Sequence, residues 1–174
     1  LYGGSSFRLW QDASADIGFN NVINLGFGGA TIAACRIYFK RLVKKHLPKH
    51  LIIYAGDNDL GSGMTPKDAL NEFKVFVAEL EESLPNTKLY FISVKPSPFR
   101  LPFLDNIILF NQFVQTLIET EINWKFIDLF TPMLDEAGTP SGSFFDSDPL
   151  HLNHTGYALL GKLIRESILS NEKE

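Results

Sequence analysis

The chain has 174 residues, of which 45% are hydrophobic and 21% charged, which is typical of one ordinary globular domain. This composition excludes a disordered, collagen-like or coiled-coil chain, and no apolar run is long enough to predict integral contact with a membrane. The net charge of −4 disfavours a nucleic-acid partner, because dedicated nucleic-acid binders are usually basic.

The lone cysteine, Cys35, excludes a disulfide framework and a cysteine-based metal cluster. One free thiol suits a reducing compartment, so we favour a cytoplasmic location, with a lost N-terminal signal left open. Leu1 and Tyr2 directly precede a Gly-Gly-Ser-Ser turn, which is too short for a whole strand. We therefore expect them to be the end of a truncated first strand within a single domain over residues 1–174.

Further along the chain, short apolar runs alternate with segments of helical periodicity. The runs at residues 21–25, 51–55, 89–94 and 124–129 predict strands, and 51–55 is apolar throughout, as in a strand buried on both faces. Helical spacing predicts helices over 31–46, 65–84, 105–122 and 153–169, and Thr65 followed by Pro66 is typical of a helix start. Residues 131–149 are rich in Gly and Pro and predict a loop.

This alternation predicts an α/β fold with a central, mainly five-stranded parallel sheet and helices on both faces. Ligands of such sheets bind outside the carboxyl ends of the strands, so the loops that follow the strands are the candidate site. These loops read Gly3-Gly4-Ser5-Ser6, residues 24–31, Gly56-Asp57-Asn58-Asp59, residues 95–98, and residues 146–151. Each sequence is common by itself, but together they place hydroxyl, amide, carboxylate and imidazole groups at one edge.

These groups are the ones that acyl transfer requires. Ser5 can supply a nucleophilic hydroxyl, His151 a base, and Asp148, three residues earlier, a carboxylate that orients the imidazole. The backbone N–H groups of Ser5 and Gly29 and the side-chain amide of Asn58 can donate hydrogen bonds to a developing oxyanion.

In these blocks and their order the sequence resembles the SGNH hydrolases, also called the GDSL esterase/lipase family. The matching blocks are Gly3-Gly4-Ser5, residues 24–31 from Asn24 through Gly29 to Thr31, residues 56–59, and residues 148–151. Gly4 replaces the aspartate of the family's first block, which puts the geometry of that loop in question rather than the nucleophile.

The resemblance implies a flavodoxin-like three-layer α/β/α sandwich and an esterase or acylhydrolase. Ser5, Asp148 and His151 would form the catalytic triad, and Ser5, Gly29 and Asn58 the oxyanion hole. The chemistry would need no metal and no cofactor. The expected partner is a small ester of a short acyl chain, with acetylated sugars or a catalytically silent ligand-binding domain as alternatives. The oligomeric state and the substrate-binding residues are not readable from the sequence.

Two other classes fit less well. A dinucleotide-binding loop would need a third glycine where Thr31 stands. A phospho-receiver domain would use Asp57 together with acidic metal ligands after the first strand, where the chain has Gly3-Gly4-Ser5-Ser6 instead.

Several residues near the blocks have plain structural interpretations. We expect His154 to be a surface residue at a helix start, and Asp146 not to replace Asp148. We expect Asp59 to bond the backbone of its own loop, and Trp10 and Cys35 to be core residues. Residues 95–103 and 134–145 are expected to line the entrance, where the aromatic side chains are either an apolar rim or ordinary packing; these are Phe99, Phe103, Phe144 and Phe145.

Overall fold

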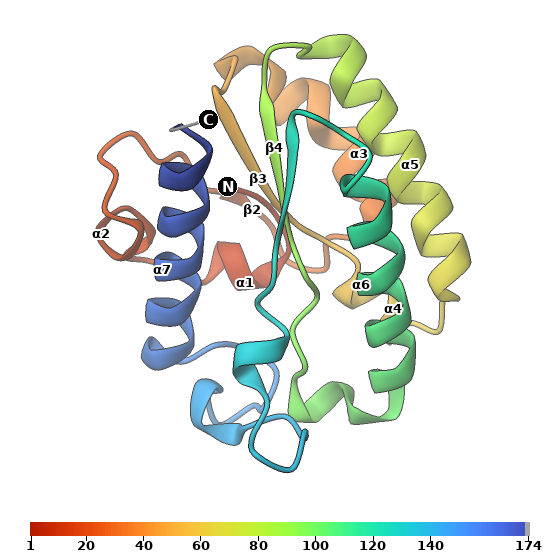
Figure 1. The fold of residues 1–174 in the computed structure, drawn as a ribbon, viewed down its shortest axis with the longest axis vertical. Helices are drawn as coiled ribbons and strands as arrows, with labels where there is room; N and C mark the ends of the chain where they lie inside the picture. Colours follow the sequence, from red (N-terminus) through yellow and green to blue (C-terminus); the bar gives the residue numbers. More distant parts are fainter. Residues whose placement is uncertain (173–174) are drawn as a thin grey trace.

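The structure is a computed structural model that describes residues 1–172. Its centre is a five-stranded parallel sheet in the order β2-β1-β3-β4-β5 (Figure 1). The strands are β1 (Tyr2–Gly3), β2 (Leu25–Gly26), β3 (His50–Tyr54), β4 (Lys88–Ile92) and β5 (Trp124–Ile127). This order and the parallel register confirm the predicted flavodoxin-like sheet, in which the carboxyl ends of all strands meet at one edge.

Helices cover both faces of the sheet and make the three layers. One face carries α3 (Ile32–Leu42), α5 (Pro66–Ser83) and α6 (Leu104–Ile118), and the other carries α1 (Ser5–Arg8), α2 (Ala13–Ile17) and α7 (His154–Asn171) (Figure 1). Along β3, Leu51 and Ile53 pack into the first core, while Ile52 and Tyr54 pack into the second. Because both faces of β3 point into apolar layers, residues 51–54 are all apolar and do not alternate with polar residues.

Side chains at the helix starts explain where three of the long helices begin. Thr65 accepts a hydrogen bond from the backbone N–H of Asp68 at 3.2 Å, with Pro66 as the first helical residue of α5, as the sequence predicted. Thr31 caps α3 in the same way, through the N–H of Ala34 at 3.1 Å. Asn153 caps α7 through the N–H of Gly156.

Some predicted boundaries are wrong, each for a local reason. The strand expected over 21–25 is only Leu25–Gly26, which pair with Tyr2 and Gly3 of β1. The helix expected to reach residue 46 ends at Leu42 and continues as one 3₁₀ turn, Lys44–His46, before Leu47 takes a left-handed conformation. The helix expected to reach residue 122 ends at Ile118, and Ile122 is 95% exposed.

Three segments expected as loops contain helical turns. Residues 57–61 form the short helix α4 (Asp57–Gly61), and residues 98–103 form a 3₁₀ helix, Pro98–Phe103. The loop expected over 131–149 holds two further 3₁₀ turns, Thr131–Met133 and Gly142–Phe144. Over the described part of the chain, no helix combines the length and the apolar character needed to cross a bilayer.

Candidate functional site

Ser5 lies at the turn between β1 and α1, at the carboxyl edge of the sheet. Gly3 makes this turn possible: its φ is +144°, and a Cβ there would lie 1.9 Å from the carbonyl oxygen of Tyr54. The N–H of Gly4 donates to the same oxygen at 3.0 Å, which ties the turn to the end of β3. Ser5 is then the first residue of α1, next to the loops that follow the other strands.

His151 and Asp148 come from the loop before α7 and complete a continuous hydrogen-bonded chain. The Nε2 atom of His151 lies 3.0 Å from the Oγ atom of Ser5, 146 residues away in sequence. The Nδ1 atom of the same ring contacts Oδ2 of Asp148, whose Oδ1 accepts the backbone N–H of His151 at 2.8 Å. These hydrogen bonds from His151 lower the pKa of Asp148 to about 2, so the carboxylate is ionised at neutral pH.

The loop that carries the acid and the base is held at several points. The Asn153 side chain donates to the carbonyls of Ser143 and Phe145, at 2.9 and 3.0 Å. The backbone N–H of Phe99 donates to the carbonyl of Pro149 at 3.2 Å, which joins the 3₁₀ helix after β4 to this loop. The position of the imidazole is therefore fixed by two neighbouring segments and by the start of α7.

Gly29 and Asn58, the other two predicted oxyanion donors, lie on the neighbouring loops. Gly29 has a φ of +68°, and a Cβ there would have nothing within 4 Å, so the space beside its backbone is open. The Nδ2 atom of Asn58 donates one hydrogen bond to the carbonyl of Ala30 at 3.0 Å and lies on the side of Gly4, 3.9 Å from where a Cβ of Gly4 would be. An amide nitrogen has two protons, so one remains for another acceptor.

Behind Asn58 lies a buried charged cluster that the sequence did not indicate. Lys95 is 1% exposed, and its Nζ atom donates to Oδ2 of Asp57 at 2.7 Å and to the hydroxyl of Tyr54 at 3.1 Å. Nε of Arg100 donates to Oδ1 of Asp57 at 2.8 Å. Burial by itself would raise the pKa of Asp57, but Lys95 and Arg100 outweigh burial and lower it to about 2. Burial would likewise lower the pKa of Lys95, and Asp57 and Tyr54 reverse this and raise it.

Two further polar residues of the blocks, Asp59 and Asn24, connect neighbouring segments rather than contacting the triad. As expected, the carboxylate of Asp59 bonds the backbone of its own loop, at Gly56 and Asp59. The same buried carboxylate also accepts the N–H of Ile32, at the start of α3, at 3.1 and 3.2 Å. Burial raises the pKa of this carboxyl group. The Nδ2 atom of Asn24 donates to the carbonyl of Phe7 at 2.7 Å and so joins the second loop to α1.

The plain interpretations of other residues are confirmed. Trp10 is 2% exposed and stacks on Tyr157 with 5.4 Å between ring centroids, and Cys35 is fully buried. His154 is exposed at the start of α7, and the carboxylate of Asp146 accepts the N–H of Ser147.

The aromatic side chains of the entrance segments divide into two kinds. Phe145 is 6% exposed and belongs to the core, whereas Phe99 is 56% exposed. Ordinary packing therefore accounts for Phe145, and Phe99 stays available as part of a rim.

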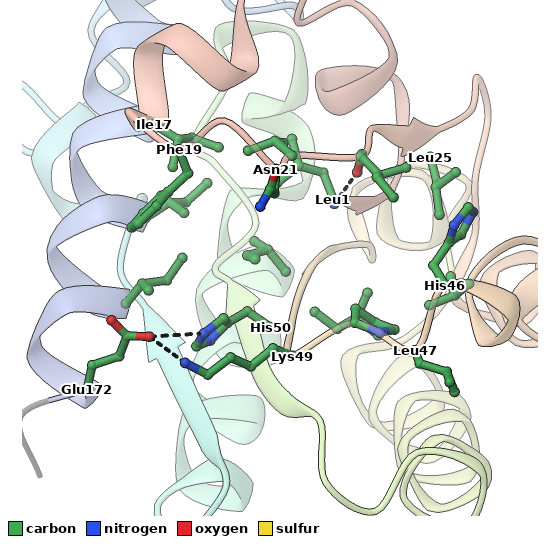
Figure 2. Close-up of a pocket in the computed structure, with 18 residues that line it drawn as sticks. Leu1, Ile17, Phe19, Asn21, Leu25, His46, Leu47, Lys49, His50 and Glu172 are labelled. Atoms are coloured by element: carbon green, nitrogen blue, oxygen red, sulfur yellow. Dashed lines mark hydrogen bonds and ion pairs between the residues drawn. The ribbon is translucent and has the colours of Figure 1, made fainter.

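A separate cavity of ≈ 460 Å³ lies at the opposite, amino edge of the sheet (Figure 2). Its walls include apolar residues such as Ile17, Leu25 and Ile164. Three polar residues at its rim pair with one another: Glu172 bonds Lys49 at 2.7 Å and lies 3.6 Å from His50. None of the triad residues or predicted oxyanion donors lines this cavity. Among residues 1–172, His, Cys, Asp and Glu side chains nowhere gather in a group of three that could hold a metal ion.

The sequence matches a family model described as the GDSL-like Lipase/Acylhydrolase family over residues 2–159. No curated protein matches the chain. The three solved structures named below share its fold at 15–22% sequence identity.

A Bacteroides fragilis protein provisionally named an acylhydrolase has a TM-score of 0.83 and 20% identity, over 97% of this chain and 85% of that one. The lipase/acylhydrolase from Enterococcus faecalis has a TM-score of 0.79 and 22% identity, over 97% and 94%. A family 3 carbohydrate esterase from Clostridium thermocellum has a TM-score of 0.75 and 15% identity, over 99% and 96%.

Proposed function

The chain belongs to the GDSL-like lipase/acylhydrolase family and is thus a hydrolase of ester bonds, and we propose that it is a serine esterase for short acyl chains that works through an acyl-enzyme on Ser5. The observation that carries this proposal is the chain of contacts from Ser5 through His151 to Asp148 at the carboxyl edge of the sheet.

In the first half of the reaction, Oγ of Ser5 attacks the acyl carbon while its proton passes to Nε2 of His151, 3.0 Å away. The C–O bond to the alcohol then breaks, and the imidazolium returns the proton to the departing alcohol oxygen. Asp148 is ionised and contacts Nδ1, so it holds that nitrogen as the donor and stabilises the imidazolium.

In the second half, Nε2 of His151 takes a proton from a water molecule, whose oxygen attacks the acyl carbon of the acyl-enzyme. The bond between the acyl carbon and Oγ breaks, the acid product leaves, and Oγ recovers its proton from the imidazolium. In both halves the negative oxygen would accept hydrogen bonds from the backbone N–H groups of Ser5 and Gly29 and from the remaining amide proton of Asn58.

The solvent exposure of the triad favours substrates with short acyl groups. The side chains of His151 and Asp148 are 24% and 51% exposed. The ≈ 460 Å³ cavity that could accommodate a long chain lies at the other edge of the sheet. A shallow, solvent-exposed site gives a long acyl chain little apolar surface to bury, so chain length should add little binding energy.

The test is hydrolysis of p-nitrophenyl esters from acetate to long acyl chains by wild type, Ser5→Ala and the matched control Ser6→Ala. We expect turnover that is fastest on short chains, an inactive Ser5→Ala protein, and a Ser6→Ala protein that keeps its activity. Equal activity of wild type and Ser5→Ala would refute the serine mechanism, and a preference for long chains would refute the short-acyl assignment.

A carbohydrate O-acetyl esterase is the second candidate, and the shared fold with a family 3 carbohydrate esterase favours it. An open triad is also compatible with a bulky sugar alcohol on the leaving side. Faster acetate release from acetylated xylan than from p-nitrophenyl acetate would select this candidate. Absence of turnover on both substrate classes, with binding retained, would instead select a catalytically silent ligand-binding domain.

A further inference from the structure

Arg100 reaches the candidate site from a segment that none of the sequence blocks contains. It lies on the 3₁₀ helix Pro98–Phe103, and its side chain is only 11% exposed. The guanidinium lies directly over Gly61, where a Cβ would come within 2.2 Å of Nη1. A glycine at the end of α4 therefore leaves the space that this side chain fills.

The guanidinium contacts two adjacent residues of α4 with different nitrogen atoms. Nε donates to Oδ1 of Asp57 at 2.8 Å, and Nη2 donates to Oδ1 of Asn58 at 3.4 Å. Lys95 holds the other oxygen of the Asp57 carboxylate at 2.7 Å. The carboxylate is thus fixed on both sides, and it fixes the guanidinium in turn.

The contact with Arg100 and the carbonyl of Ala30 together fix which way the carboxamide of Asn58 points. A guanidinium can only donate hydrogen bonds, so it selects the oxygen of the amide, and the carbonyl of Ala30 can only accept, so it selects the nitrogen. The two together exclude the flipped amide. One Nδ2 proton goes to Ala30, and the nitrogen remains on the side of Gly4.

The net charge of the cluster of Asp57, Lys95 and Arg100 favours the same orientation of the Asn58 carboxamide. Lys95 and Arg100 bring two positive charges to the single negative charge of Asp57, which leaves one net positive charge next to Asn58. A preorganised donor that needs no reorientation during the reaction stabilises an oxyanion better than a mobile one.

We propose that Arg100 is a positioning residue, which, through its bridge between Asp57 and Asn58, holds the amide nitrogen of Asn58 toward the oxyanion. The proposal rests on the function proposed above for the Ser5 site. It places Arg100 away from the substrate, so its effect must pass through Asn58.

A double-mutant cycle on p-nitrophenyl acetate tests this path. Asn58→Ala should lower kcat about 10²–10³-fold. Arg100→Ala should lower kcat by about 10-fold or more with KM changed less than about twofold, and the double variant should be no slower than Asn58→Ala. Additive losses, or a kcat of Arg100→Ala equal to that of wild type, would overturn the proposal.

Two further variants test whether Arg100 acts by positioning Asn58, by its charge alone, or through folding. Arg100→Lys keeps the charge but cannot bond Asp57 and Asn58 at once, so we expect it to be as slow as Arg100→Ala. A wild-type kcat in Arg100→Lys would overturn the proposal, because it would show that a positive charge at this position is sufficient. Arg36→Ala removes an arginine that pairs with Glu79 at 3.1 Å on the far helices and should leave kcat unchanged. Arg100→Ala should itself fold, because the Lys95–Asp57 pair that it leaves behind is neutral.

A second readout does not depend on esterase activity. In ¹H–¹⁵N spectra the side-chain amide of Asn58 is identified by its absence in Asn58→Ala. Its two signals should shift in Arg100→Ala and Arg100→Lys and stay in place in Arg36→Ala. Shifted signals in an enzyme that hydrolyses no ester would refute the proposed function and leave the role of Arg100 standing. Unshifted signals would refute the role of Arg100, whatever the activity.

Discussion

The hydroxyl of Tyr157 in α7 donates a hydrogen bond to the backbone carbonyl of Ser6, 2.9 Å away and 151 residues earlier in the chain. Ser6 follows the proposed nucleophile, and Tyr157 lies in the helix that follows the proposed base. This single buried contact therefore joins the two halves of the triad. Stacking of Tyr157 on Trp10 adds a second contact between the same two regions.

Removal of the Tyr157 hydroxyl should break the hydrogen bond to Ser6 without changing the packing of the core. We expect Tyr157→Phe to lose about 1 kcal/mol of unfolding free energy, because a buried carbonyl loses its donor, and to lower kcat a few-fold. Urea unfolding and p-nitrophenyl acetate kinetics measure both effects. Tyr38→Phe is the matched control, since Tyr38 is 41% exposed, and equal losses in the two variants would contradict this account.

Activity should depend on pH through the imidazole of His151. The base must be neutral to accept the Ser5 proton, so kcat/KM should rise with pH between about 5 and 8 and then level off. Asp148, whose pKa is lowered to about 2, stays ionised across this range and adds no second transition. A profile that is flat between about pH 5 and 8 on p-nitrophenyl acetate would speak against a histidine base.

Stability should depend on acid pH through Asp57. Its pKa falls from 3.8 to about 2 on folding, so its contribution, of about 2 kcal/mol, is complete above about pH 4 and is lost as the pH falls through about 2. Asp57→Asn should remove this dependence. It should also cost about 3–5 kcal/mol at neutral pH, because Lys95 and Arg100 would remain buried without their anion.

Urea unfolding between about pH 2 and 7 measures both consequences of Asp57→Asn. The exposed Asp105→Asn variant is the control, and it should follow the wild-type curve. If Asp57→Asn and wild type had the same stability at pH 7, the cluster would not be a stabilising ion pair.

The sequence predicts the triad well but gives no sign of the cluster of Asp57, Lys95 and Arg100. Ser5, His151 and Asp148 could be predicted because they lie in segments that follow strands, and the parallel topology brings such segments together at one sheet edge. The contact of Asp57 with Arg100 could not, because it depends on how the 3₁₀ helix Pro98–Phe103 folds back over Gly61. Lys95 gave no signal either, since a lysine after a strand usually faces solvent.

The boundary errors have the same origin in tertiary contacts. Residues 21–25 have strand composition, but of these only Leu25 pairs with β1, and the carbonyl of Ile23 accepts a hydrogen bond from the amino group of Leu1. The segment 57–61 has turn composition, yet it forms a helical turn that holds Asp57 and Asn58 against Arg100. Local sequence pattern carries no information about either partner.

The two adjacent glycines of the first loop should respond to substitution in opposite ways. A Cβ on Gly3 would lie 1.9 Å from the carbonyl oxygen of Tyr54, at a φ of +144°, whereas the nearest atom to a Cβ on Gly4 would be 3.9 Å away. Gly3→Ala should therefore lose on the order of 3 kcal/mol or more. Gly4→Ala should stay within about 0.5 kcal/mol of wild type.

The space at Gly4 also answers the question raised by the first block, where the family carries aspartate. Gly4 has a φ of −78° and stands at the N-cap of α1, where aspartate is favourable, so Gly4→Asp should fold at least as stably as wild type and keep its esterase activity. Thermal unfolding and p-nitrophenyl acetate turnover test this. A strongly destabilised Gly4→Asp protein would mean that this loop has departed from the family geometry and that Ser5 is presented differently.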